Sequence, residues 1–194
     1  SESARAASTL MCVSEEDRLR WDRRYTDRPA VSPDEPALPG VFLPFADDFP
    51  TGGQGLDLAC GRGEAAVWLA RRGVAVCGFD VSAVAIAHAR ALAQRCGVTD
   101  RCRFDVVDLD DGIPPGPPVD VLICNRFRDP RLDRAIVERL AVGGLLAVSA
   151  LSEVGGSPGP FRAEPGELRI AFGDLEGVAG DEADGLAWLL ARRR

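Results

Sequence analysis

The stretch from Gly55 to Ala70, Gly-Leu-Asp-Leu-Ala-Cys-Gly-Arg-Gly-Glu-Ala-Ala-Val-Trp-Leu-Ala, predicts a strand, a tight glycine turn and a helix. Leu56 and Leu58 are apolar and suit a buried parallel strand. Gly61 and Gly63 permit backbone conformations and close approaches that a Cβ atom would obstruct. A strand that leads through such a turn into a helix N-terminus commonly binds a nucleoside-bearing ligand. The alternative is a purely structural turn.

The acid inside the predicted strand indicates which ligand fits. Asp57 lies four residues before Gly61. A dinucleotide places its pyrophosphate at the helix start, where a carboxylate so close would repel it. S-adenosylmethionine (SAM) has no phosphate and carries a sulfonium and an ammonium, so an acid at the strand end suits it. The residues favour SAM, although Gly61 to Ala66 also fits the loose dinucleotide pattern G-x-G-x-x-G/A.

The segment Asp57-x-Ala59-x-Gly61-x-Gly63 resembles motif I of the class I SAM-dependent methyltransferases. Ala59 replaces the first glycine of that motif and leaves slightly less room under the ligand. The resemblance implies an α/β fold: a single Rossmann-like domain with a mostly parallel seven-stranded sheet, helices on both faces and a C-terminal antiparallel hairpin. It assigns this turn, Cys60 included, to the cofactor.

Acids follow the next two predicted strands. Asp80 ends the second strand, nineteen residues after Gly61, and an acid at that separation commonly accepts hydrogen bonds from both ribose hydroxyls. We assign it and Val81 to the cofactor; the alternative for Asp80 is an N-cap of the next helix. The third strand is predicted over Cys102–Asp108.

Asp108 and Leu109 stand where the resemblance implies adenine binding, with the carboxylate on the exocyclic amine and a backbone amide near a ring nitrogen. Asp110 and Asp111 are rivals for the acid's role. The alternative is a polar turn at the strand end.

The end of the fourth predicted strand, Asn125-Arg126-Phe127, adjoins the first strand at the topological switch, where open α/β sheets bind ligands. We predict that Asn125 and Arg126 are catalytic residues that face the methyl group or the substrate, and that Asn125 also borders the cofactor. Arg128 is predicted to hold an acidic small substrate.

The segment Trp21-Asp-Arg-Arg-Tyr25 resembles the W-x-x-R/K-Y segment before motif I in small TehB-like and thiopurine-methyltransferase-like enzymes. In those families this arm closes over cofactor and substrate, which implies the same for Trp21 and Tyr25; the alternative is an amphipathic helix packed on the domain. The expected organisation is a disordered or cloning-derived tail (1–13), an N-terminal arm and lid (14–50) and a SAM-binding domain (51–194).

Composition excludes several classes of protein. The 194 residues carry a net charge of −7, which argues against nucleic acid and anionic membranes as partners. All 23 basic residues are arginine, so Schiff-base lysine chemistry is excluded. One histidine and six cysteines without a C-x-x-C spacing predict no metal site. Reduced cysteines and the lack of a long apolar run favour a cytoplasmic protein. We expect the protein to be a monomer or a homodimer.

These observations predict a SAM-dependent methyltransferase (EC 2.1.1 type) acting on a small-molecule acceptor. The alternatives are an NAD-dependent oxidoreductase and a non-catalytic SAM-binding protein. No histidine is suitably placed as a base, so a base would be a carboxylate such as Asp129 or Asp47. This favours a soft or amine nucleophile, or an acceptor that is already anionic.

Overall fold

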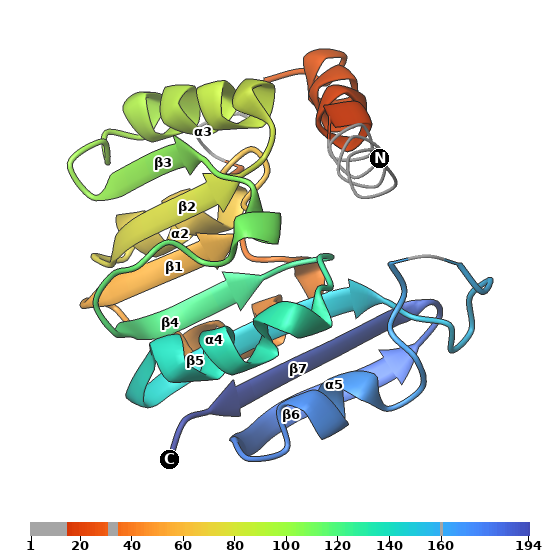
Figure 1. Cartoon of the computed structure of the whole chain (residues 1–194). Coiled ribbons are helices and arrows are strands. Elements are labelled where there is room, and N and C mark those ends of the chain that lie inside the picture. Colours follow the sequence, from red (N-terminus) through yellow and green to blue (C-terminus); the bar gives the residue numbers. More distant parts are fainter. Residues whose placement is uncertain (1–14, 31–34, 160) are drawn as a thin grey trace, which may run out of the picture.

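One seven-stranded sheet organises the chain, of which the computed structural model describes residues 15–30, 35–159 and 161–194. The strand order is β3-β2-β1-β4-β5-β7-β6, and β7 runs antiparallel to both of its neighbours while the other pairs are parallel (Figure 1). The strands are β1 (Gln54–Leu58), β2 (Ala75–Asp80), β3 (Cys102–Val106), β4 (Val119–Cys124), β5 (Leu140–Leu151), β6 (Glu176–Ala183) and β7 (Leu186–Arg192). The predicted parallel sheet with a C-terminal hairpin is confirmed.

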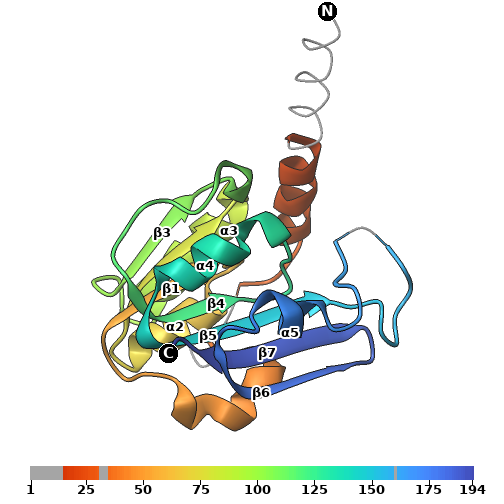
Figure 2. The ribbon, with the colours of Figure 1, turned by 60° about the horizontal axis from the view of Figure 1, so that its bottom comes forward.

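Helices cover both faces of the sheet, as predicted. Besides the helical residues 15–26, the described helices are η1 (Gly40–Asp48), α2 (Glu64–Arg71), α3 (Ala83–Arg95), η2 (Leu109–Asp111), η3 (Pro130–Leu132), α4 (Asp133–Arg139) and α5 (Glu167–Ala171). One apolar core packs η1, α2 and α3 against the sheet, and a second core packs α4 and α5 on the opposite face (Figures 1 and 2). Two buried layers explain why four of the five residues of β1 and five of the six residues of β4 are buried.

The order of the strands reverses at β1, which lies between β2 and β4. The carboxyl ends of β1 and β4 are therefore side by side, with Leu58 opposite Cys124. In open α/β sheets, ligands bind at the carboxyl ends of the strands where the strand order reverses. This is the edge to which the sequence assigned the candidate residues.

The third strand is shorter than predicted. It ends at Val106, whereas the sequence predicted a strand through Asp108. The Asp108 carboxylate accepts a hydrogen bond from the Asp110 amide (2.9 Å) and caps η2. Such a local side-chain bond offers the backbone an alternative to the strand ladder.

Candidate functional site

The turn after β1 is built from left-handed backbone. Ala59, Gly61 and Gly63 have φ values of 52°, 56° and 76°. A Cβ atom on Gly63 would lie 2.7 Å from the Cβ of Ala89 and 3.0 Å from the Phe104 ring, so only glycine fits there. Ala59 adopts the conformation of the glycine that it replaces, which costs about 1 kcal/mol or more for an L-residue. The backbone therefore follows the glycine-rich path despite the alanine.

Asp57 lies under this turn with its carboxylate fully enclosed. The residue is 2% exposed, and burial together with the nearby Asp80 raises its pKa to about 8. One oxygen, Oδ2, has no hydrogen-bond partner among the described residues. A buried carboxylate oxygen without a partner is costly, and a positive ligand placed above the turn would offset that cost.

Asp80 ends β2 with both carboxylate oxygens on backbone amides. Its Oδ2 accepts from the Gly61 amide (2.8 Å) and its Oδ1 from the Ser82 amide (2.9 Å). Each oxygen keeps a lone pair that can accept from a ribose hydroxyl. The N-cap alternative is wrong, because Ser82 caps α3 by accepting from the Ala85 amide (3.1 Å). Val81 lies between Asp80 and Ser82 in the sequence. The hydrogen bond from the Gly61 amide fixes the Asp80 carboxylate directly against the glycine turn.

Of the acids after β3, Asp108 directly follows the residue that is hydrogen-bonded to the end of β2. Its neighbour Val107 donates to the backbone oxygen of Asp80 (2.9 Å), and Leu109 is buried. Asp110 is exposed and forms an ion pair with Arg131 (2.8 Å). The geometry favours Asp108 over Asp110 as the adenine-binding acid, which remains a prediction.

At the end of β4, a buried serine holds the two predicted catalytic residues. The hydroxyl of Ser149 on β5, itself fully buried, donates to Asn125 Oδ1 (2.7 Å) and accepts from the Arg126 amide (2.9 Å). Arg126 has a φ of 53°, so this turn is also left-handed. The sequence analysis missed Ser149, since a polar residue in an apolar strand was the only signal.

Arg128 does not reach toward the crevice as a free cation. Its guanidinium, 5% exposed, makes two hydrogen bonds to Asp133 (2.5 and 2.9 Å) and one to Glu167 (2.5 Å). These contacts join the loop after β4 to α4 and α5. The arrangement gives Arg128 a structural role and disfavours the substrate-binding role that the sequence suggested.

The N-terminal arm lies over the carboxyl edge. Residues 15–26 are helical and stand beyond the ends of β2 and β3, beside the start of α3 (Figures 1 and 2). The rings of Trp21 and Tyr25 stack, with centroids 6.1 Å apart. The Tyr25 hydroxyl is 2.9 Å from where a Cβ of Gly61 would be, and burial and Asp80 raise its pKa to about 12. The aromatic pair is thus placed beside the glycine turn.

A carboxylate that the sequence analysis missed docks this helix. Asp22 accepts a short hydrogen bond from the Ser82 hydroxyl, and its Oδ1 is 3.5 Å from the Val84 amide. It therefore sits at the N-terminus of α3, where negative charge is favoured. In the sequence, the signal for Asp22 was its position inside the segment from Trp21 to Tyr25. Residues 1–14, which include the predicted tail, lie outside the described part of the chain.

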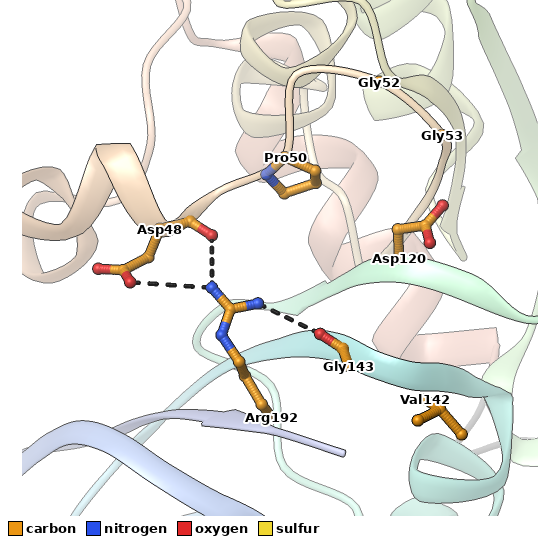
Figure 3. Close-up of a pocket in the computed structure, with 8 residues that line it drawn as sticks. All are labelled: Asp48, Pro50, Gly52, Gly53, Asp120, Val142, Gly143 and Arg192. Carbon is orange, nitrogen blue, oxygen red and sulfur yellow. Dashed lines mark hydrogen bonds and ion pairs between the residues drawn. The ribbon is translucent and has the colours of Figure 1, made fainter. Parts of the chain in front are cut away.

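A hollow lies at the opposite, amino edge of the sheet (Figure 3). It measures about 450 Å³ and is lined by Asp48, Pro50, Gly52, Gly53, Asp120, Val142, Gly143 and Arg192. Arg192 crosses it, donating to the backbone oxygens of Asp48 (2.9 Å) and Gly143 (3.2 Å). None of the predicted site residues lines this hollow.

The described residues contain no cluster of three or more His, Cys, Asp or Glu side chains that could hold a metal ion. Within the same residues, no helix has the length and hydrophobicity needed to cross a membrane.

Comparison with known proteins identifies the family. Residues 56–143, which include the glycine turn, Asp80, Asp108 and Asn125, match the family described as a methyltransferase domain. The fold is that of TehB from Haemophilus influenzae, with a TM-score of 0.71 and 21% identity, over 81% of this chain and 63% of that one. Residues 56–143 thus match a methyltransferase domain, and the chain has the fold of the class I SAM-dependent methyltransferases.

Further similarities place this methyltransferase domain among diverse relatives. Magnesium protoporphyrin IX methyltransferase from Synechocystis, solved with bound S-adenosylhomocysteine (SAH), has a TM-score of 0.68 at 17% identity, over 95% of this chain and all of that one. Ribosomal RNA small subunit methyltransferase C from Chromohalobacter salexigens is 32% identical over 72% of this chain. The chain spans only 32% and 41% of the lengths of the two curated relatives that it matches.

The residues of the methyltransferase site fit SAM, the cofactor of this family. The unpartnered Asp57 oxygen suits a cation, and Asp80 offers free lone pairs beside the turn. The sequence therefore predicted both the fold and the family, while the individual site residues remain predictions.

Proposed function

We propose that this chain transfers a methyl group from SAM to a small-molecule acceptor. The observation that carries the proposal is the buried, unpartnered carboxylate of Asp57 beneath a left-handed glycine turn. Bound SAM would supply the activated methyl group. Asp80 would orient the ribose and Asp108 the adenine amine, while the Asn125–Arg126 turn would face the acceptor.

The N-terminal arm has a clear task in this proposal. Transfer requires the acceptor to be held in line with the methyl group and water to be kept out. Trp21 and Tyr25 are stacked beside Gly61, and Asp22 fixes their helix to α3. We therefore assign Trp21 and Tyr25 to covering the bound cofactor and acceptor.

A small acceptor is supported by charge and by related folds. A chain with a net charge of −7 lacks the overall positive field that attracts nucleic acid. Solved structures with this fold include enzymes named for magnesium protoporphyrin IX and for geranyl diphosphate. The ribosomal RNA methyltransferase among the relatives makes RNA the alternative acceptor that an assay has to include.

Thermal shift with SAM, SAH and NAD tests the cofactor. The proposal predicts stabilisation by SAM and SAH and none by NAD, because a pyrophosphate would face Asp57 and Asp80. Stabilisation by NAD alone would support the oxidoreductase alternative. An assay for SAH release with small acceptors and with RNA then separates the remaining possibilities. A protein that binds SAH yet methylates nothing would be the non-catalytic alternative.

A further inference from the structure

The orientation of one amide in the site can be derived from its neighbours. Ser149 is fully buried, and its oxygen already accepts the amide proton of Arg126 (2.9 Å). Its own hydroxyl proton needs an acceptor, and Asn125 Oδ1 at 2.7 Å is that acceptor. If the amide were flipped, the Ser149 proton would face an NH₂ group and remain buried without a partner, which is costly.

The other end of the same amide is free. The amide nitrogen of Asn125 donates to no described residue, and it is not among the buried atoms that lack a partner. It therefore meets solvent at the carboxyl end of β4. The oxygen is occupied by Ser149, so what Asn125 offers a ligand is a hydrogen-bond donor. The exposed Arg126, held in the same turn, adds a positive charge.

The two carboxylates that the sequence suggested as a base, Asp129 and Asp47, are poorly suited to deprotonate an acceptor. Asp129 makes hydrogen bonds to Arg131, which lower the pKa of its carboxyl group. Asp47 lies on η1, next to Asp48, which lines the hollow at the opposite edge of the sheet. Neither is placed and tuned to take a proton at the end of β4.

We infer that Asn125 selects a methyl acceptor whose nucleophilic atom is anionic, such as a thiolate, and rejects the matching amine, and that Ser149 is the positioning residue for this choice. This inference rests on the proposed methyltransferase function. A thiolate accepts the Asn125 N–H and has no proton to lose. Its lone pair forms the new S–CH₃ bond, while the broken bond's electrons remain on the departing sulfur. A neutral amine has a single lone pair, which the attack on the methyl group requires, so it cannot accept the Asn125 N–H and attack at the same time, and it lacks the charge that strengthens this hydrogen bond.

Paired ligands of one skeleton test the inference on the protein saturated with SAH, in which no transfer occurs. The pairs are ethanethiol with ethylamine, thiophenol with aniline, and thiosalicylate with anthranilate. Calorimetry above the thiol pKa should show at least one thiolate binding about tenfold or more tighter than its amine, as expected for a charge-assisted hydrogen bond. An amine that binds as tightly in every pair, or no binding by any pair, overturns the inference.

Three variants separate positioning from mere structural support. Asn125→Asp offers only acceptors and should reverse the thiolate-to-amine ratio. Ser149→Ala frees the amide to flip and should reduce the ratio toward one. Ser152→Ala is the matched control, because Ser152 is equally buried near the end of β5 but bonds to Glu182 (2.7 Å). A ratio unchanged in Asn125→Asp would refute the inference, whatever Ser149→Ala does to folding. Failure to bind SAH would instead refute the proposed methyltransferase function.

Discussion

The two edges of the sheet hold their charges differently. At the amino edge, Asp48, Asp120 and Arg192 line an open hollow and have ordinary partners, such as the Gln54 amide on Asp120 (2.8 Å). At the carboxyl edge, Asp57 and Asp80 are 2% and 7% exposed, and no described cation pairs with either. This hollow is at the amino edge, and the electrostatically unbalanced groups are at the carboxyl edge.

The contrast between the two edges shows which feature indicates a binding site. Surface carboxylates cost little, whereas buried carboxylates and left-handed L-residues lower stability unless the structure gains something from them. The carboxyl edge combines both, at Asp57, Ala59 and Arg126. We therefore place the ligand there, on the grounds of buried charge and backbone strain rather than of cavity volume.

The largest effect is expected from a methyl group added to the glycine turn at the carboxyl edge, compared with a methyl group added at the amino edge. Gly63→Ala combines a left-handed φ with a 2.7 Å clash against Ala89 and should destabilise the protein by about 2 to 5 kcal/mol. Gly143→Ala, at the amino edge, has a φ of 78° and no atom within 4 Å, so it should cost only about 1 kcal/mol. Urea denaturation measures both; equal losses would show that the carboxyl-edge turn is not tightly packed.

Next comes the dependence of stability on pH that Asp57 imposes. Its pKa is raised in the folded state to about 8 from an unfolded value near 4, so the folded protein holds the proton more tightly. This stabilisation is complete below pH 4 and is lost as pH rises through about 8. The stability of the wild type relative to Asp57→Asn should fall by up to about 1.4 kcal/mol per pH unit between those limits. Parallel pH profiles in thermal melts would contradict the burial argument.

A smaller effect is expected on ligand affinity. Asp80→Asn removes the charge and one acceptor from the ribose position and should weaken SAH binding by about 10- to 100-fold. Asp120→Asn, which replaces a carboxylate that accepts a backbone amide at the other edge, is the control and should leave the SAH Kd unchanged. Calorimetry measures the SAH Kd of both variants. A similar loss of SAH affinity in both would contradict the assignment of the site.

The smallest effect concerns the alanine that replaces a glycine. Ala59 has a φ of 52°, so Ala59→Gly should relieve strain and stabilise the protein by about 1 kcal/mol. The wild-type side chain would also leave less room under the ligand, so SAH should bind the variant at least as tightly. A destabilised variant would show that the alanine methyl group contributes packing that outweighs the strain.

The sequence predicted the sheet, the glycine turn and the acids at the strand ends, because these follow from local patterns of apolar residues, glycine and spacing. It could not predict which carboxylates are buried or which arginine is already paired. Arg128 reads as a free cation in the sequence, yet its partners Asp133 and Glu167 come from two different helices. Ser149 likewise acquires its role only when β5 lies beside β4.

The proposed function depends on a cationic nucleoside that binds over the buried carboxylate of Asp57. Calorimetry of SAM binding near pH 7, in two buffers with different ionisation enthalpies, measures the protons exchanged on binding. A cation above Asp57 must lower its raised pKa, so the wild type should bind SAM more tightly than Asp57→Asn and release more protons in doing so. The same proton exchange in both proteins, with equal affinity for SAM, would contradict the claim.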